Sequence, residues 1–224
     1  MKNAIQKKRL LYIIFALVCA CFFFSCADDS EEYGTVSLAV ARSGSLENPQ
    51  LAVVISGGYS YTATTALSST VRIDDVPVGA VISISVLIGT GEEGYCGSIK
   101  NYTVQSGNNV VPIEAKKPVL SIFPEDAVQD ASGSGGQLEY SEGNVTLSLN
   151  VDLPGATFVW SFTPEYSSTS LKKQSTSSSY SIPVEDLYAI TTTGTFSGTA
   201  QCTYTLGNLN GVCKLYKIHI TSGS

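Results

Sequence analysis

The sequence predicts an all-β protein of two tandem β-sandwich modules that follow a signal peptide. Short segments in which apolar and polar residues alternate recur along the chain, separated by Gly, Pro, Asn or Asp. No stretch of useful length places apolar residues at the i, i+3, i+4, i+7 spacing of an amphipathic helix. The basic N-terminal region leads into an apolar run of 15 residues, which is shorter than the roughly 20 that a membrane-spanning helix needs.

Residues 1–25 have the order of parts expected of an export signal. Basic residues precede the apolar run Leu10–Phe24, and Ser25 and Cys26 follow it. The residues from Phe23 to Cys26 resemble the cleavage motif of a bacterial lipoprotein signal peptide. The resemblance implies that Cys26 is lipidated, becomes the first residue of the mature chain and anchors it to a membrane through two or more acyl chains.

Other readings of this segment stay open. Cys21 is a second candidate for the lipid, but cleavage before it would leave three phenylalanines on a solvated N-terminus, so we prefer Cys26. An uncleaved anchor and simple secretion are the remaining alternatives. The acidic tether, residues 26–33, resembles the export tether of surface lipoproteins in the Bacteroidetes group. It implies anchoring to the outer membrane with exposure at the cell surface, and a periplasm-facing position is the alternative.

The charge of the mature chain excludes one class of partner. Four of the 13 basic residues and none of the 19 acidic residues precede Cys26, so nine basic and 19 acidic residues remain, a formal net charge of −10. Such a chain has no electrostatic footprint for nucleic acid, and an anionic membrane surface repels it. We therefore expect attachment to the membrane through the lipid on Cys26 and no nucleic-acid partner.

The first module is predicted to span residues 34–117. Leu51–Ser56 and Val81–Ile88 are nearly continuous apolar runs, and the other segments alternate. Gly57-Gly58, the stretch from Asp74 to Gly79, and Ser106-Gly107-Asn108-Asn109 have turn composition. Around them we expect strands at 36–40, 51–56, 59–61, 71–73, 81–88, 102–104 and 110–113.

The order of these segments resembles the transthyretin-like or carboxypeptidase-regulatory-like β-sandwich. The stretches that carry the resemblance are Thr35–Leu38, Val71–Gly79 and Val104–Val110. It covers about 80 residues, and it implies a fold and no activity.

The second module is predicted to span residues 118–221. Strands are expected at 118–122, 145–151 and 158–162, with a turn at Pro154-Gly155. Residues 124–143 read as a long loop and Ser167–Ser181 as a polar tract, after which Tyr180 and Ile182 resume the alternation. The strand centred on Trp160 resembles that of immunoglobulin-like and PKD-like modules, which implies that Trp160 is buried.

The last two segments, 196–206 and 211–220, are predicted to form a hairpin around Gly207-Asn208. With that two-residue loop Cys202 faces Cys213, at a Cα separation that a disulfide accepts. A bond there would stabilise the fold by on the order of 3 kcal/mol. Two free thiols, or a register shifted by the competing Asn210-Gly211 turn, are the alternatives. Cys96 is then left free and is expected to be buried.

Groups for catalysis are scarce, so we expect no enzyme, no cofactor and no metal site. One histidine, His219, cannot supply a multi-histidine site within one chain. Adjacent acids such as Asp74-Asp75 face opposite ways in a strand and read as turn or surface residues. Tyr59 and Tyr61 share a strand face and could contact a ligand, although strand tyrosines usually pack.

These observations favour a non-catalytic cell-envelope lipoprotein whose modules act in adhesion or ligand binding, with an unidentified protein or glycan partner. A structural or fimbria-like assembly subunit is the first alternative. A carbohydrate-binding surface lipoprotein is the second.

Overall fold

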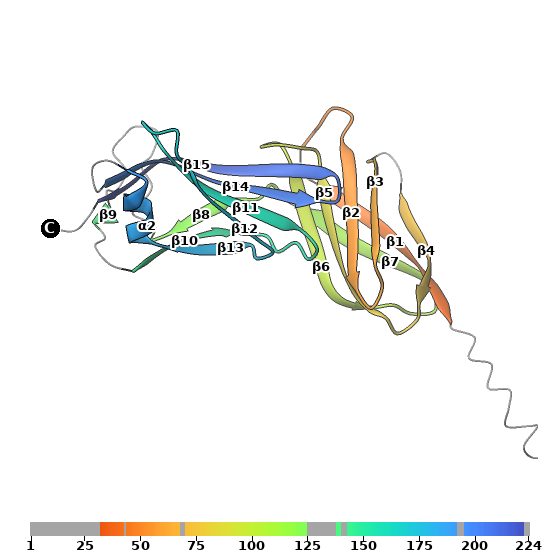
Figure 1. Cartoon of the computed structure of the whole chain (residues 1–224). Coiled ribbons are helices and arrows are strands. Elements are labelled where there is room, and N and C mark those ends of the chain that lie inside the picture. Colours follow the sequence, from red (N-terminus) through yellow and green to blue (C-terminus); the bar gives the residue numbers. More distant parts are fainter. Residues whose placement is uncertain are drawn as a thin grey trace, which may run out of the picture. The chain divides into compact units, whose positions relative to one another are not determined.

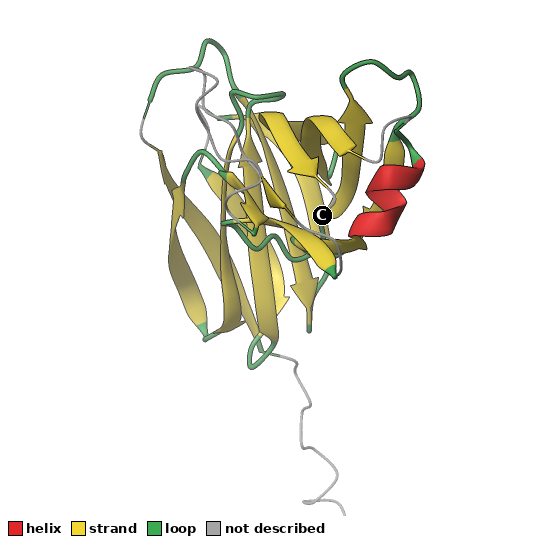
Figure 2. Ribbon diagram, turned by 90° about the vertical axis from the view of Figure 1, so that its left-hand side faces the viewer, coloured by secondary structure: helices red, strands yellow, loops and turns green. Residues whose placement is uncertain are grey.

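The computed structural model describes residues 32–42, 44–67, 70–124, 138–139, 143–191 and 195–221. The predicted signal peptide, Cys26 and most of the acidic tether lie outside these residues. Tyr33–Ser224 form one compact unit. In its described part the elements are strands and one short helix, which confirms the all-β class (Figure 2). No helix in the described residues has the length and apolar character to span a bilayer.

The first half of the described chain forms two sheets that enclose a common core (Figure 1). One sheet has the strand order β4-β1-β7 and the other β3-β2-β5-β6. We call them the N-terminal sheet pair. The strands are β1 (Tyr33–Arg42), β2 (Gln50–Gly57), β3 (Tyr61–Ala66), β4 (Val71–Pro77), β5 (Val81–Ile88), β6 (Tyr95–Thr103) and β7 (Gly107–Ala115).

Strand β1 lies at the centre of the three-stranded sheet. It pairs antiparallel with β4, with an irregularity between Gly34 and Val36, and parallel with β7 from Gly34–Gly107 to Arg42–Ala115. Alternate residues of β1, such as Val36 and Leu38, are buried in the core. The intervening residues therefore point out of the sandwich.

The second half of the described chain forms another two sheets, which we call the C-terminal sheet pair. Their strand orders are β13-β10-β8 and β12-β11-β14-β15-β9. Trp160 is fully buried between them and stacks on Phe158, as its predicted core position requires. The elements are β8 (Leu120–Phe123), β9 (Leu138–Glu139), β10 (Asn144–Leu149), β11 (Thr157–Pro164), β12 (Leu171–Ser175), β13 (Ser179–Pro183), α2 (Val184–Ala189), β14 (Thr195–Leu206) and β15 (Leu209–Thr221).

The four-stranded sheet is buried on both faces. Leu51, Val53 and Ile55 of β2 face the N-terminal core, whereas Ala52 and Val54 pack into the core of the C-terminal sheet pair. This double burial explains why β2 and β5 are continuous apolar runs rather than alternating ones.

Hydrogen bonds and ion pairs also join the two sheet pairs. The buried Ser85 hydroxyl donates to the Pro154 carbonyl at 2.8 Å, in the predicted turn. The amide of Gly91 donates to Asn210 at 2.8 Å, and that of Val212 donates to Gly91 at 2.9 Å. Two ion pairs lie beside them, Lys117–Glu93 at 3.2 Å and Lys214–Glu92 at 2.7 Å. The division into two modules, with their residue limits, stays a prediction beside this continuous packing.

Several local predictions were wrong, and β9 also lies within the predicted long loop. Residues 171–175 of the predicted polar tract form β12, which pairs with β11 although Leu171 is its one apolar residue. Asn108 and Asn109 were assigned to a turn but belong to β7, whose parallel partner β1 extends their pairing. Asp74 and Asp75 also lie within a strand, β4, where Asp75 adopts a φ of 58°.

Candidate functional site

The outward face of the sheet β4-β1-β7 presents two adjacent hydrogen-bonded groups of polar side chains. In β1 the residues that point away from the core include Tyr33, Thr35 and Ser37. The strand register places Ser37 beside Arg72 of β4, and Thr35 beside Asn108 of β7. We call Tyr33, Thr35, Ser37, Arg72, Asp74 and Asn108 the polar face.

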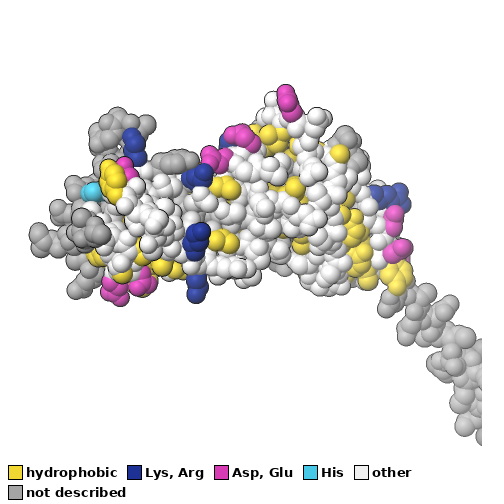
Figure 3. All heavy atoms as spheres, turned by 45° about the horizontal axis from the view of Figure 1, so that its top comes forward, with side chains coloured by type: hydrophobic (Ala, Val, Ile, Leu, Met, Phe, Trp, Pro, Cys, Tyr) yellow, Lys and Arg dark blue, Asp and Glu magenta, His cyan; other side chains and the backbone are white. Residues whose placement is uncertain are grey.

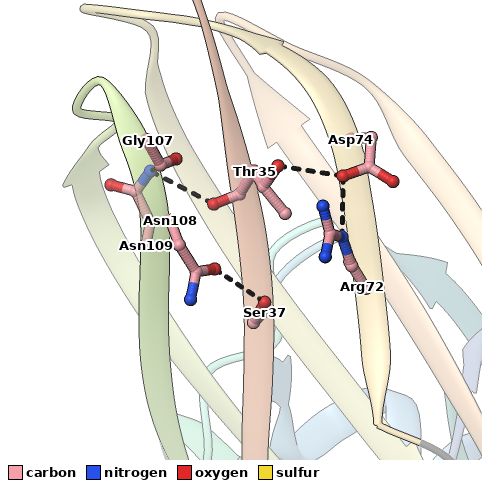
Figure 4. A network of polar contacts seen from close by, with 7 residues as sticks. All are labelled: Thr35, Ser37, Arg72, Asp74, Gly107, Asn108 and Asn109. Atoms are coloured by element: carbon pink, nitrogen blue, oxygen red, sulfur yellow. Dashed lines mark hydrogen bonds and ion pairs between the residues drawn. The ribbon is translucent and has the colours of Figure 1, made fainter.

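Hydroxyl groups of β1 hold the side chains of both neighbouring strands (Figure 4). The Thr35 hydroxyl donates to Oδ1 of Asp74 at 2.9 Å, and Nε of Arg72 donates to the same oxygen at 2.9 Å. On the other side, the Ser37 hydroxyl donates to Oδ1 of Asn108 at 2.9 Å. The central strand therefore orients an ion pair on one side and an amide on the other.

The Asp74 carboxylate is held in its charged form. The hydrogen bond from Arg72, followed by that from Thr35, keeps the pKa of Asp74 below its usual value. Both side chains of the Arg72–Asp74 pair are more than half exposed, at 66% and 55%. Because exposed ion pairs add little to stability, this pair fixes the orientation of the Arg72 guanidinium more than it supports the fold.

The same bonds leave defined groups available to a ligand. Only Nε of Arg72 is engaged, and among the described residues neither its Nη groups nor the Asn108 amide Nδ2 has a hydrogen-bond partner. These groups are donors, and the second oxygen of Asp74 is an acceptor. Neighbouring strands are about 4.8 Å apart, so side chains on β4 and β7 flank β1 at a separation of about 10 Å.

The buried side chain of Asn109, beneath the polar face, links β7 to β1 through hydrogen bonds. Its Oδ1 accepts from the Tyr102 hydroxyl at 3.1 Å and from the Gln105 amide at 2.9 Å. Its Nδ2 donates to the carbonyls of Thr35 at 3.2 Å and Gln105 at 2.8 Å. Asn109 is 5% exposed, so these bonds join β7 and the preceding turn to β1 without solvent competition.

Exposed apolar groups border the polar ones. Tyr33 is 47% exposed two residues before Thr35, and Val110 is 60% exposed beside Ser37. Figure 3 shows hydrophobic, acidic and basic side chains gathered where the described chain begins. An aromatic ring next to oriented donors and acceptors suits a ligand with an apolar face and a hydroxylated edge.

Tyr59 and Tyr61, the aromatic residues singled out in the sequence, are half-buried. Tyr61 is the first residue of β3 and Tyr59 lies just before it, and both pack against the N-terminal core. This placement favours packing, and ligand contact by them stays a prediction. The predicted module begins at Gly34, whereas β1 begins at Tyr33, so the prediction does not include this residue. Its outward spacing with Thr35 and Ser37 was the signal that could have found it.

The predicted hairpin register is confirmed, but the predicted disulfide is not formed. Cys202 faces Cys213, yet both are free thiols, as is Cys96. The Cys213 Sγ instead donates to the Pro118 carbonyl at 3.4 Å, which directs it to the segment between β7 and β8. Burial raises the pKa of Cys96 to about 12 and that of Cys213 to about 11. Cys96 is buried as expected, at 1% exposure.

The adjacent acids have ordinary roles in the described residues. Asp74 belongs to the polar face, and Glu92 and Glu93 form ion pairs with Lys214 and Lys117. Within the part of the chain that the structure describes, no cluster of His, Cys, Asp and Glu could hold a metal ion. No protein-family model and no curated protein matches this sequence.

Proposed function

We propose that this protein is a lipid-anchored, non-catalytic cell-envelope protein that binds a neutral glycan on its polar face. The observation that carries the proposal is the oriented Arg72–Asp74 pair, whose carboxylate is held by Thr35, two residues from exposed Tyr33 on the same strand face. The anchor would be the lipid on Cys26 in the outer membrane, with the described unit at the cell surface. The adhesion or ligand-binding role then depends on this face.

The chemistry of the face matches a sugar. Vicinal hydroxyls can pair with planar groups such as guanidinium, carboxylate and amide, which present two polar atoms side by side. The apolar face of a pyranose ring can lie on Tyr33, because aromatic rings offer a broad contact surface with few rotatable bonds. The face is an open sheet surface, which suits a segment of a chain.

Charge selects a neutral ligand over an anionic one. The mature chain carries a formal net charge of −10, and Asp74 and Asp75 lie within the face or at its border. An acidic saccharide would meet repulsion that the single Arg72 guanidinium does not remove.

Binding of the unlipidated mature chain to an array of neutral and acidic oligosaccharides tests the proposal. We expect selective binding of neutral glycans, weakened about tenfold by Tyr33→Ala, Arg72→Ala or Asn108→Ala, since each removes a contact worth about 1.4 kcal/mol. Matched controls are Tyr166→Ala, at a tyrosine that is 92% exposed, and Lys172→Ala, at an exposed cation of β12.

The variants are expected to remain folded, because the Arg72–Asp74 pair is exposed and such pairs contribute at most about 1 kcal/mol. Equal loss of binding in the control variants, or glycan binding that is unchanged in all three site variants, would contradict the assignment of the polar face.

A further inference from the structure

We propose that the saccharide bound by the polar face is carried by the same membrane that anchors the protein, as the head group of a neutral glycolipid. The inference rests on the proposed function, because it names the source of the glycan. It follows from the position of the face in the chain, from its openness and from its lack of a net positive charge.

The face lies close to the anchor along the chain. Tyr33 is seven residues after Cys26, so even a fully extended connection spans at most about 25 Å. Ser37 is four strand residues farther, which adds about 13 Å. The covalent connection therefore limits the polar face to the layer next to the membrane, where glycolipid head groups lie.

The polar face is expected to bind a saccharide with low affinity. Its ligand-contacting groups lie on an open sheet surface, and its ion pair is more than half exposed to solvent. A ligand there is incompletely desolvated, so low affinity is expected. A short tether compensates, because confinement of both partners to one surface gives an effective concentration in the millimolar range. A site with a dissociation constant of about 1 mM would then be about half occupied.

Charge also separates a glycolipid from an ordinary anionic lipid. The acidic residues of the tether, among them Glu31 and Glu32, precede the face directly. They oppose contact with anionic head groups, whereas a neutral saccharide head group meets no such repulsion. The occupant that fits is therefore a neutral sugar on a lipid.

The test uses the full lipidated chain in phosphatidylcholine vesicles, with and without digalactosyl diacylglycerol as the probe. Hydroxyl-radical oxidation of Tyr33, read by mass spectrometry, reports occupancy, and exposed Tyr166 is the internal reference. We expect oxidation of Tyr33 relative to Tyr166 to fall at least twofold when the glycolipid is present. Arg72→Ala should abolish this protection.

A variant with a longer tether tests whether the short connection between Cys26 and the polar face is needed for binding of the glycolipid. A flexible insertion of about 30 Gly and Ser residues between Asp29 and Ser30 should lower the effective concentration on the order of tenfold and remove most of the protection. The matched control is the same insertion in the unlipidated chain, where protection of Tyr33 by soluble digalactoside should not change.

The outcomes distinguish the two proposals. Protection by soluble neutral oligosaccharides but not by glycolipid in the same vesicle would overturn this inference and leave the proposed function standing. The same holds if the insertion leaves protection by the glycolipid intact. Protection by vesicles that lack the glycolipid would show contact with lipid alone and overturn the saccharide assignment. If neither the glycolipid nor any soluble saccharide protects Tyr33 from oxidation, the proposed function is contradicted as well.

Discussion

At the scale of single residues, the three described thiols show how burial sets chemistry. Cys96, Cys202 and Cys213 are all buried, and burial is the main cause that raises each pKa. At neutral pH they are therefore protonated and poorly nucleophilic, since the thiolate is the reactive form. The three free thiols fill space in the core cluster that the C-terminal sheet pair shares with Ala52, Val54 and Leu87.

The thiols predict a loss of stability at alkaline pH. An unfolded thiol titrates near pH 9, whereas the folded pKa values are about 12 for Cys96 and about 11 for Cys213. Because the unfolded chain releases these protons first, the stability they contribute is complete below pH 9 and declines as the pH rises through 11 to 12. Urea unfolding of the unlipidated mature chain on either side of pH 9 measures this decline.

The control is a variant with alanine at Cys96, Cys202 and Cys213, whose stability should depend less on pH over the same range. Cys26 is also alanine in both proteins, so that every remaining thiol is described. Alkylation of the unfolded, unreduced parent must modify three thiols. Two unreactive cysteines would show instead that the hairpin disulfide forms in solution.

The residues of the polar face could not be grouped from the sequence alone. The types of residue that the face contains are visible in the sequence, but the sequence pattern assigns Asp74 to a turn and Arg72 to the strand before it. Asn108 was likewise assigned to a turn. Their convergence depends on β1 pairing with β4 and β7, which lie some 35 and 70 residues away in the chain. Alternation along one segment contains no information on such partners.

At the scale of elements, the contact of β5 with the turn before β11 makes a clear prediction. Ser85→Ala should destabilise the protein by about 1 to 3 kcal/mol, because the half-buried Pro154 carbonyl loses the donor that the fully buried Ser85 supplies. The matched control is Ser83→Ala, two residues earlier on the same face of β5, where the half-buried serine makes no hydrogen bond to a described side chain or carbonyl. Chemical denaturation compares the two variants, and equal destabilisation would show that the bond contributes nothing.

The elements differ in how far the sequence determines them. The register of the β14–β15 hairpin was predicted correctly from Ala200 to Leu206, because a two-residue loop fixes the pairing of the strands beside it. The irregularity between Gly198 and Ala200 and the start of β15 at Leu209 were not predicted. Strand β12 was missed because Lys172 and Lys173 occupy an edge, where charged residues are tolerated and discourage further pairing. The crossover from β1 to β7 was missed because no short turn joins parallel strands.

At the scale of the whole molecule, the shared packing predicts one cooperative transition. Ala52, Val54 and Leu87 of the N-terminal sheet pair belong to the same core cluster as Trp160. Unfolding of one pair would expose these side chains, so neither is expected to unfold alone. Trp160 fluorescence reports the C-terminal sheet pair and far-ultraviolet circular dichroism reports all strands, and the two should give coincident denaturation curves. Separate midpoints would show independent modules.

The apolar runs of β2 and β5 could have indicated in the sequence that the four-stranded sheet is covered on both faces. A strand with apolar residues on both faces needs a covering layer on each. The sequence could therefore indicate that something covers the four-stranded sheet. It could not identify Pro154 and the β14–β15 loop as the cover, because those residues lie about 70 to 150 positions away from β2 and β5.

The parallel pairing of β1 with β7 also determines how the molecule resists pulling. Force applied to the chain before Tyr33 acts along β1, while β7 leads at its far end to Ala115 and the C-terminal sheet pair. Such a load shears the ladder, so its hydrogen bonds share the strain together instead of opening one after another. The strand that presents the polar face is thus also the mechanical clamp nearest to the proposed anchor at Cys26.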